Sequence, residues 1–271
     1  MVEIINSLQN KTIKNAAKLS EKKYRQQTGL FMLEGIKLVQ ELVDSSWQID
    51  SVFIDKNLTL STDFLSELNT RCANLYYVTP EIIAKISDVS SAQGIVAVAH
   101  MHNHPAEGCS LGEHDTVLLL ENIQDPGNIG TIIRTAVATG VSAVIMTVDC
   151  ADIYSPKVVR SSMGGLLRMP ILIMDISEAI AYLRAQGFKI HVTSLHDATN
   201  LYSAQLSGKT AIVLGNEANG VSDYALAQAD SKLFIPQIGK IESLNVSIAA
   251  GVIMYETLRQ KINCGIYTLD N

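Results

Sequence analysis

The sequence lacks a long hydrophobic segment. No apolar run approaches the roughly 18 residues that are needed to cross a bilayer. The first residues carry Lys11, Lys14 and Lys18 among asparagine and glutamine, and they contain no apolar core of the kind that a secretory signal needs. We therefore expect a cytoplasmic protein with no membrane partner.

Cysteine is scarce and widely spaced. The cysteines are Cys72, Cys109, Cys150 and Cys264. None belongs to a Cys-x-x-Cys pair, which argues against a disulfide framework and against a structural zinc site. We expect free, buried thiols and no metal.

The composition excludes a disordered or fibrous chain. Apolar residues make up 47% and charged residues 18% of the 271 residues, which is enough apolar side chain to bury a sizeable core. At about 150 residues per domain, this length predicts two domains.

Charge is unevenly distributed along the chain. The net charge is −6 overall, yet residues 1–28 carry +4, which leaves −10 for residues 29–271. A basic arm on an acidic body can contact phosphate locally, although a run of charges is also typical of a solvated helix face. The candidate phosphate contacts in this arm are Lys14, Lys18, Lys22, Lys23 and Arg25.

A first α/β pattern predicts a small domain over residues 1–101. The expected elements are a strand at 30–33, a helix at 36–43 and strands at 51–54, 75–78 and 95–99. Residues 102–114 contain Pro105 and Gly108 and are predicted to be a linker. His100, His102 and His104 alternate there as metal ligands on a strand would, but histidines beside a linker proline are more often exposed to solvent.

A second, stronger pattern predicts another domain over residues 115–271. We expect strands at 117–120, 143–147, 171–174, 189–194, 210–214 and 232–236, and helices at 129–139, 157–168, 177–185, 221–228 and 246–262. Serial βα units predict a mostly parallel sheet with helices on both faces. Ligands of such sheets bind beyond the carboxyl ends of the strands, so the loops after Leu120, Leu214 and Pro236 form the candidate site.

The loop after Leu120 places polar groups at the start of a helix. It contains Asn128 and Gly130, where backbone N–H groups and an amide side chain are available to a ligand. Arg134 lies about 100° from the centre of the apolar stripe of this helix, so its side chain can reach out of the core. A surface ion pair is the plainer alternative for Arg134.

The loop after Leu214 combines a glycine with a carboxylate. Gly215 leaves room for a ligand to approach the backbone, and Glu217 lies at a strand end, where function is more common than packing. Asn219 and Gly220 are also ordinary turn residues.

The third loop leads into the last helix. Ser243 and Asn245 both suit a helix N-cap. Leu244 between them offers an apolar surface on which a flat ring can rest.

Together, the three loops resemble the motifs of one enzyme family, the SpoU/TrmH family of RNA ribose 2′-O-methyltransferases within the SPOUT superfamily. The matching segments are Asn128-Ile-Gly-Thr-Ile-Ile-Arg134, Leu214-Gly-Asn-Glu-Ala-Asn-Gly220, and Ile235-Pro followed by Glu242-Ser-Leu-Asn-Val-Ser-Ile-Ala-Ala250. Residues 152–160, with Ser161 and Gly164, resemble a further family segment, so the likeness covers residues 115–262. The N-terminal part, including residues 31–35 and 93–97, is similar to the family's substrate-binding domain, which has the fold of a kink-turn-binding ribosomal protein.

The resemblance implies an α/β fold in which a mostly parallel sheet with a deep trefoil knot follows a smaller α/β domain. It also implies a homodimer with a composite active site and S-adenosylmethionine as cofactor. The cofactor-binding residues that it implies are Gly215, Asn216, Ile235, Leu244 and Asn245. Threaded chains are rare, so the knot is expected from the resemblance alone. The absence of a Gly-x-Gly-x-x-Gly loop is consistent with this cofactor, because that loop serves the pyrophosphate of dinucleotides.

The implied reaction is attack of a ribose 2′-hydroxyl on the methyl group of a sulfonium. An alcohol is a weak nucleophile at neutral pH, so some group must accept or offset its proton. In the family, the residue matching Arg134 has been proposed as the base, but a guanidinium stays protonated and we expect an electrostatic clamp instead. The implied catalytic residues are Asn128, Arg134, Glu217, Ser243 and Asn245.

The expected substrate is RNA, and an N-terminal substrate domain favours large-subunit (23S) ribosomal RNA over tRNA. In addition to the basic arm, the candidate phosphate contacts are Lys157, Arg160 and Arg168. The alternative is that these are ordinary surface charges. Two rival functions remain: a non-catalytic RNA-binding member of the family, and a nicotinamide-dependent oxidoreductase, which the loop pattern disfavours.

Overall fold

The chain folds into two compact units. The computed structural model describes residues 3–89, 91–102, 111–241 and 243–267. One unit comprises Met1–Asn103 together with Asp152–Arg168, and the other comprises His104–Ala151 together with Met169–Asn271. The segment Asp152–Arg168 therefore belongs to the first unit, although it follows the first strands of the second unit in sequence.

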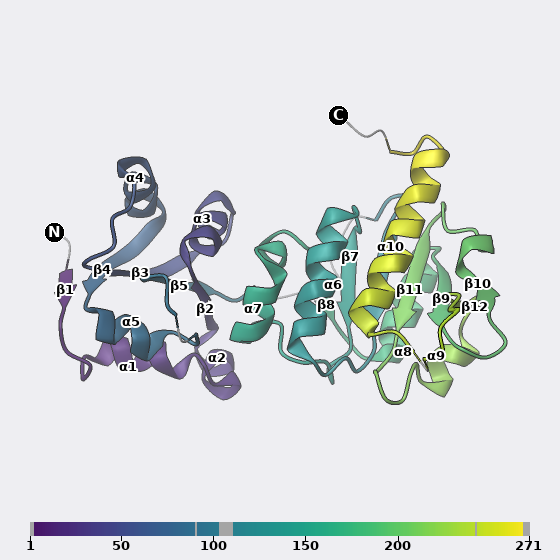
Figure 1. Ribbon diagram of the computed structural model, residues 1–271, viewed down its shortest axis with the longest axis horizontal. Coiled ribbons are helices and arrows are strands. Elements are labelled where there is room, and N and C mark those ends of the chain that lie inside the picture. Colours follow the sequence, from purple (N-terminus) through teal and green to yellow (C-terminus); the bar gives the residue numbers. More distant parts are fainter. Residues whose placement is uncertain (1–2, 90, 103–110, 242, 268–271) are drawn as a thin grey trace. The chain divides into compact units, whose positions relative to one another are not determined.

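The first unit is a five-stranded mixed sheet between helices. Its elements are β1 (Glu3–Ile5), α1 (Lys11–Lys18), α2 (Lys22–Thr28), β2 (Leu30–Glu34), α3 (Ile36–Asp44), β3 (Ile49–Asp55), α4 (Thr62–Arg71), β4 (Cys72–Val78), α5 (Pro80–Ile86) and β5 (Ile95–His100), joined by α7 (Pro156–Ser162) and the 3₁₀ turn η1 (Gly165–Leu167). The strand order is β1-β4-β3-β5-β2, and β5 runs antiparallel to both its neighbours. Helices α1 and α5 cover one face, and α3 and α4 cover the other (Figure 1).

The basic arm is part of this core. Ile13 and Leu19, from α1 and its C-cap, pack with Ile82, Ile83 and other buried residues against the sheet. The lysines lie on the outer side of the same helices, because an amphipathic helix buries one stripe and exposes the other. These helices, like β1, α4 and α5, are elements that the sequence patterns did not predict.

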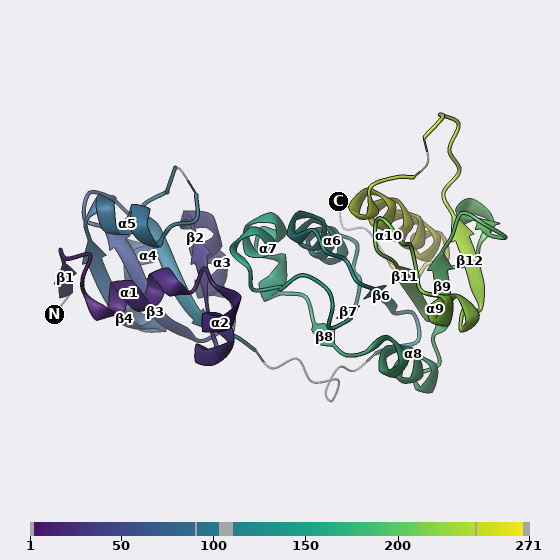
Figure 2. The ribbon, with the colours of Figure 1, turned by 90° about the horizontal axis from the view of Figure 1, so that it is seen from below.

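The second unit is a seven-stranded parallel sheet. Its elements are β6 (Thr116–Leu120), α6 (Pro126–Ala138), β7 (Ala143–Met146), β8 (Ile171–Ile173), α8 (Ile176–Ala185), β9 (Lys189–Thr193), β10 (Thr199–Asn200), η2 (Leu201–Ser203), β11 (Thr210–Leu214), α9 (Asp223–Ala227), β12 (Ser231–Phe234) and α10 (Val246–Asn263). The strand order is β10-β12-β9-β11-β6-β7-β8, and every pairing is parallel. Helices α6 and α10 cover one face and α8 and α9 the other (Figure 2).

The predicted parallel α/β sheet is confirmed, with the central strands β6 and β11 buried at every residue. Such strands need apolar side chains on both faces, which is why they appear as continuous apolar runs in the sequence. Helix α6 begins where Asp125 accepts a hydrogen bond from the Asn128 N–H and Pro126 occupies the first turn, both common at helix starts.

The predicted helix over residues 157–168 is confirmed as far as Ser162 and is wrong beyond it. Helix α7 ends at Ser162, Met163 has φ of 48° and Gly164 has φ of 85°. Two successive residues in the left-handed region cannot continue an α-helix, and a separate 3₁₀ turn follows. Of the cysteines in the described residues, Cys150 is buried, Cys72 is half-buried and Cys264 is exposed. All three are free, but the expectation of buried thiols is wrong for Cys264. Cys109 and His104 lie outside the described residues.

The described part of the chain contains neither a membrane span nor a metal cluster. Within residues 3–89, 91–102, 111–241 and 243–267, no helix is both long and apolar enough to cross a membrane. The same ranges contain no group of three or more His, Cys, Asp or Glu side chains arranged to hold a metal ion.

Candidate functional site

The carboxyl ends of β9, β11 and β12 surround a cavity of about 550 Å³. Its walls come from residues 193–196, residues 214–221, Leu226, and residues 233–235, 237, 243, 244, 246 and 249. The volume lies in the range of sites for small organic ligands. The end of β9 and the residues after it, Thr193 to His196, were not among the predicted loops, although β9 adjoins β11 and its carboxyl end lies at the same sheet edge.

Gly215 lies at a very close approach between two backbone segments of the cavity wall. A Cβ atom on Gly215 would lie 2.2 Å from the carbonyl carbon and oxygen of Gly220 and 2.3 Å from the Val221 nitrogen. The Gly220 N–H donates a 2.8 Å hydrogen bond to the Asn216 carbonyl, so the loop 215–221 closes on itself. Only glycine fits at position 215, because a side chain there would force these backbone segments apart.

Asn216 lines the cavity, and its side chain forms hydrogen bonds with the backbone of its own loop and of a neighbouring loop. Its Oδ1 accepts hydrogen bonds from the Ala218 and Asn219 N–H groups at 2.9 and 3.2 Å. Its Nδ2 donates to the Asn122 carbonyl at 2.9 Å. Of the other residues expected to hold a cofactor, Gly215, Ile235 and Leu244 line the cavity, whereas Asn245 does not.

A chain of polar side chains joins all three predicted loops. Asn245 Nδ2 donates to Asn128 Oδ1 at 3.0 Å, and Asn128 Nδ2 donates to Glu217 Oε1 at 2.7 Å. Asn245 Oδ1 also caps α10 by accepting hydrogen bonds from the N–H groups of Ser247 and Ile248. An amide has both donors and an acceptor, so Asn128 can link a carboxylate to a second amide.

Arg134 and Ser243 stand apart from this chain. Arg134 lies on α6 six residues beyond Asn128, about 9 Å along the helix axis at 1.5 Å per residue. Its side chain is exposed, does not line the cavity, and has no hydrogen bond or ion pair within the part of the chain that the structure describes. Ser243 is exposed and lines the cavity.

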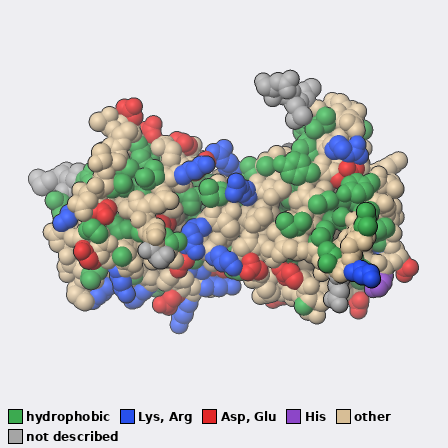
Figure 3. Space-filling model, in the orientation of Figure 1, with side chains coloured by type: hydrophobic (Ala, Val, Ile, Leu, Met, Phe, Trp, Pro, Cys, Tyr) green, Lys and Arg blue, Asp and Glu red, His purple; other side chains and the backbone are tan. Residues whose placement is uncertain are grey.

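The cationic side chains expected to contact phosphate fall into two groups. The lysines of α1 and α2 are exposed, and Figure 3 shows Lys and Arg side chains along the edge of the first unit that these helices form. Arg25 is only 3% exposed. Its guanidinium pairs with Asp152 at 2.6 Å and donates to the carbonyls of Leu19 and Ser20. The expectation that Arg25 contacts phosphate is therefore wrong, because its donors are used inside the first unit.

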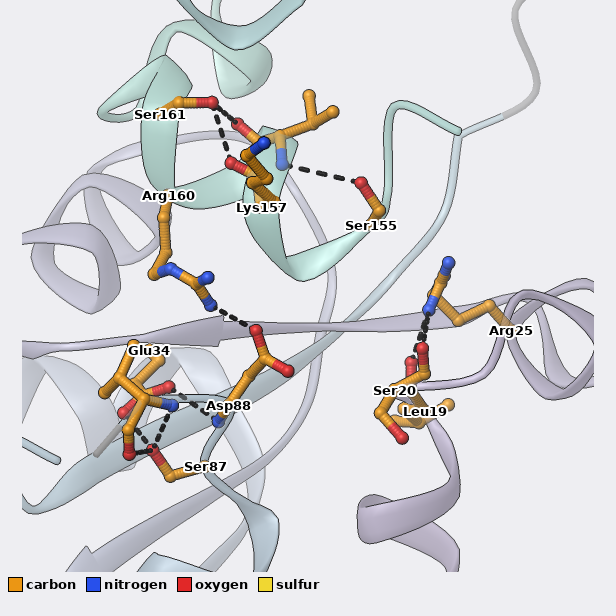
Figure 4. A network of polar contacts seen from close by, with 12 residues as sticks. Leu19, Ser20, Arg25, Glu34, Ser87, Asp88, Ser155, Lys157, Arg160 and Ser161 are labelled. Carbon is orange, nitrogen blue, oxygen red and sulfur yellow. Dashed lines mark hydrogen bonds and ion pairs between the residues drawn. The ribbon is translucent and has the colours of Figure 1, made fainter. Parts of the chain in front are cut away.

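The segment Asp152–Arg168 is fastened within the first unit by further arginine pairs. Arg160 pairs with Asp88 at 2.7 Å, and Asp88 lies beside the Glu34–Ser87 hydrogen bond (Figure 4). Arg168 pairs with Glu41 and stays 58% exposed. The exposed Lys157 lies on the same helix as Arg160. Arg160 and Arg168 thus have carboxylate partners at part of their donor groups.

Two family models match consecutive parts of the chain. Residues 115–255 match the model of the SpoU rRNA Methylase family, and residues 10–97 match the model of the MRM3-like substrate binding domain. The chain is 32% identical over 251 residues to the 23S rRNA (guanosine(2553)-2′-O)-methyltransferase RlmP of Bacillus subtilis, over 93% of this chain and 97% of that protein.

Two solved structures resemble this chain over nearly its whole length. The AdoMet-bound rRNA methyltransferase from Sinorhizobium meliloti has a TM-score of 0.88 and 30% identity, over 95% of this chain and 98% of that one. The SpoU methyltransferase AviRb from Streptomyces viridochromogenes, in complex with AdoMet, has a TM-score of 0.85 and 27% identity, over 94% and 99% of the two chains.

Proposed function

The chain belongs to the SpoU rRNA methylase family, and from this premise we propose that it methylates the ribose 2′-hydroxyl of 23S ribosomal RNA with S-adenosylmethionine as methyl donor. The observation that carries the proposal is the Asn245–Asn128–Glu217 chain, which joins the three loops beside the cavity. Because the substrate would be ribosomal RNA, the proposed site of action is the cytoplasm.

The cavity suits an uncharged, largely flat group held by backbone. Gly215 lets the loop 215–221 close on itself so that its backbone forms part of the cavity wall, and Ile235 and Leu244 add apolar surface. The adenosyl group of S-adenosylmethionine has this chemistry. Bound there, the cofactor supplies an electrophilic methyl group. Gly215, Asn216, Ile235 and Leu244 are the residues that we propose hold it, while Asn245 acts through Asn128.

The chain's own polar groups have separate proposed roles. Asn128, Glu217 and Asn245 form one hydrogen-bonded unit that orients the ribose, with the Ser243 hydroxyl at the cavity wall. Arg134 stays protonated, so we assign it to an RNA phosphate and to the negative charge that develops on the ribose oxygen.

The first unit is the proposed RNA-binding part. Its match to a substrate-binding domain supports residues 1–101 as that domain, 102–114 as linker and 115–271 as the methyltransferase domain. The relative from Bacillus subtilis, whose alignment includes this unit, is named for 23S rRNA, which supports rRNA over tRNA. The proposed phosphate contacts are Lys14, Lys18, Lys22, Lys23, Lys157, Arg160 and Arg168.

We also propose a homodimer with a composite active site. Ile248 and Tyr255 on α10 are 54% and 56% exposed, and hydrophobic side chains gather over the face that α6 and α10 present (Figure 3). Arg134 is exposed on α6 and does not line the cavity of its own chain, which supports an arrangement in which a second copy supplies Arg134 to the cavity. The trefoil knot of this family is part of the same proposal.

The test of activity is transfer of tritium from labelled S-adenosylmethionine to unmodified 23S rRNA and, separately, to tRNA, with nuclease digestion of the product. A 2′-O-methylated nucleoside from rRNA is the expected result. Label in tRNA instead would keep the chemistry and overturn the substrate. Binding of S-adenosylhomocysteine without transfer to either RNA or to ribosomal subunits would favour a non-catalytic RNA-binding protein.

The test of the composite site is a mixture of two inactive variants, Arg134→Ala and Gly215→Val. After subunit exchange, half of the dimers are mixed and each has one intact site, so about a quarter of wild-type activity should return. Native mass spectrometry checks the exchange. Mixed dimers without any recovered activity would show that each site is built by one chain.

A further inference from the structure

Glu121 is a buried carboxylate at the end of the central strand β6. It follows directly after this strand and is 8% exposed. Among the described residues no lysine, arginine or histidine pairs with it, and it does not line the cavity. A buried carboxylate is costly unless hydrogen bonds compensate it, so its hydrogen bonds indicate what it does.

Glu121 hydrogen-bonds both ends of the loop 215–221. Its backbone N–H donates to the carbonyl of Leu214, the residue before the loop, at 2.8 Å. Its Oε2 accepts from the N–H of Ser222, the residue after the loop, at 2.9 Å. One residue therefore holds the point where the loop leaves β11 and the point where it turns into α9.

The neighbouring residue adds a third tie to the same loop. Asn122 has φ of 56°, a conformation that asparagine tolerates better than most residues. Its carbonyl accepts from Asn216 Nδ2, and its N–H donates to Thr147 Oγ1, both at 2.9 Å. The end of β6 thus anchors the loop at its entry, its second residue and its exit.

A small displacement of these anchor points should change the conformation of the whole loop 215–221, because its backbone is tightly packed. Gly215 already lies against Gly220 and Val221 so closely that a single methyl group would not fit between them. If the exit at Ser222 moves, the backbone of 215–221 has to move with it. This backbone forms one wall of the cavity.

We propose that Glu121 is a positioning residue that sets the affinity of the cavity for S-adenosylmethionine through the loop 215–221, without contacting the cofactor. The inference rests on the proposed function for the identity of the ligand. It assigns the role to the carboxylate oxygen as a hydrogen-bond acceptor and not to its charge, since no cationic side chain in the described residues pairs with it.

The first experiment compares Glu121→Ala with Glu121→Gln. Calorimetry with S-adenosylhomocysteine should give a Kd raised about tenfold in Glu121→Ala, because the Ser222 N–H loses its acceptor. Glu121→Gln keeps an acceptor oxygen and should stay within twofold of wild type. In methyl-transfer assays, the KM for S-adenosylmethionine should rise with the Kd while the KM for RNA is unchanged. Glu113→Ala, an exposed turn residue of the same unit, is the control.

A double-mutant cycle tests the hydrogen bond itself. Ser222 has φ of −62°, which proline can adopt, so Ser222→Pro removes the N–H without changing that angle. Ser222→Ala is the reference, because both variants lose the hydroxyl that caps α9. Adding Glu121→Ala should raise the Kd about tenfold in the Ser222→Ala background and leave it within twofold in the Ser222→Pro background.

The outcomes separate this inference from the proposed function. Wild-type protein that does not bind S-adenosylhomocysteine would refute the proposed function. If wild type binds, an unchanged Kd in Glu121→Ala, or equal effects in the two Ser222 backgrounds, would overturn the positioning role. An affinity loss in Glu121→Gln as large as in Glu121→Ala would overturn the acceptor role. If Glu121→Ala fails to fold, the two Ser222 variants still test the positioning role, because only Ser222→Pro lacks the N–H that Glu121 accepts. Equal Kd values for Ser222→Pro and Ser222→Ala would then overturn that role.

Discussion

Two polar clusters, one in each unit, join distant segments with different side chains. In the second unit, the side-chain amide of Asn128 links Glu217 and Asn245 from two other loops by donating a hydrogen bond to the carboxylate and accepting one from the second amide. In the first unit, Arg25 links its own helix to Asp152 and is buried in doing so. An exposed amide network keeps donors and acceptors that a substrate can share, whereas a buried guanidinium is used up by its internal partners. Polar contacts at the cavity are therefore suited to binding, and those around Arg25 to holding the segment Asp152–Arg168.

Replacing Arg134 should have the largest effect, a loss of kcat. Its side chain belongs neither to the hydrogen-bond chain of the three loops nor to the contacts around Arg25, so it is free to act on the RNA. In Arg134→Ala, kcat should fall by about 100- to 1,000-fold, as when one transition-state donor is removed. The Kd for S-adenosylhomocysteine should stay within twofold, because we assign Arg134 to the RNA phosphate and the ribose oxygen and not to the cofactor. Arg134→Lys keeps the charge and should recover part of kcat. Single-turnover methyl transfer measures the effect, and a near-normal rate in Arg134→Ala would remove it from the mechanism.

Arg25 tests the structural side of the comparison. Arg25→Ala leaves the Asp152 carboxylate and two carbonyls without their donor, so the free energy of unfolding should fall by about 3 kcal/mol. The salt dependence of RNA binding should be unchanged at a temperature where the variant is folded. Urea unfolding and filter binding give the two numbers. A normal stability together with a smaller salt slope would mean that Arg25 contacts phosphate after all.

Lys261 offers a pH test of the second unit. Lys261 is 1% exposed, its ammonium donates to the His114 carbonyl and the Thr116 hydroxyl, and burial lowers its pKa from 10.5 to about 8. Between pH 8 and 10.5 the unfolded chain therefore binds more protons than the folded chain, so stability contributed by this group rises with pH.

The comparison variant for this test is Lys261→Met, which removes the titrating group. Relative to this variant, wild type should gain about 1 to 2 kcal/mol of unfolding free energy from pH 8 to 10.5, less than an unscreened shift would give. Urea unfolding at several pH values measures the difference, in which all other titrating groups cancel. A constant difference would show that Lys261 titrates normally.

The exposed lysines should give the smallest effects. Lys14→Ala or Lys22→Ala should weaken RNA binding a few-fold and reduce the slope of log K against log salt by about 0.7 to 0.9 for each phosphate that the variant no longer neutralises. The melting temperature should not change, since neither lysine is buried. Lys209→Ala, on the second unit, serves as the charge-matched control. An identical slope in all three variants would place RNA elsewhere.

Most strands and helices of the second unit could be predicted from short sequence patterns, because each of these elements is marked by residues close together in the chain. Buried parallel strands such as β6 and β11 are apolar at nearly every residue, and the loops after them carry glycine and asparagine at fixed spacing. The first unit was harder, because β4 is only partly buried and α4 has a weak apolar stripe, so neither α4 nor the full length of β4 was predicted. The end of helix α7 was also not predicted, because methionine at position 163 gives no sequence signal for the positive φ that it adopts.

The sequence by itself determined the fold class, the family and the three loops at the carboxyl edge of the sheet, since each depends on residues close together in the chain. The tertiary structure alone decided which polar residues meet. It turned Arg25 inward to Asp152, placed residues 152–168 in the first unit, and put the Glu121 carboxylate against the Ser222 N–H. These pairs lie about a hundred residues or more apart, and no local spacing predicts them, because only packing of the whole unit brings their side chains within hydrogen-bonding distance.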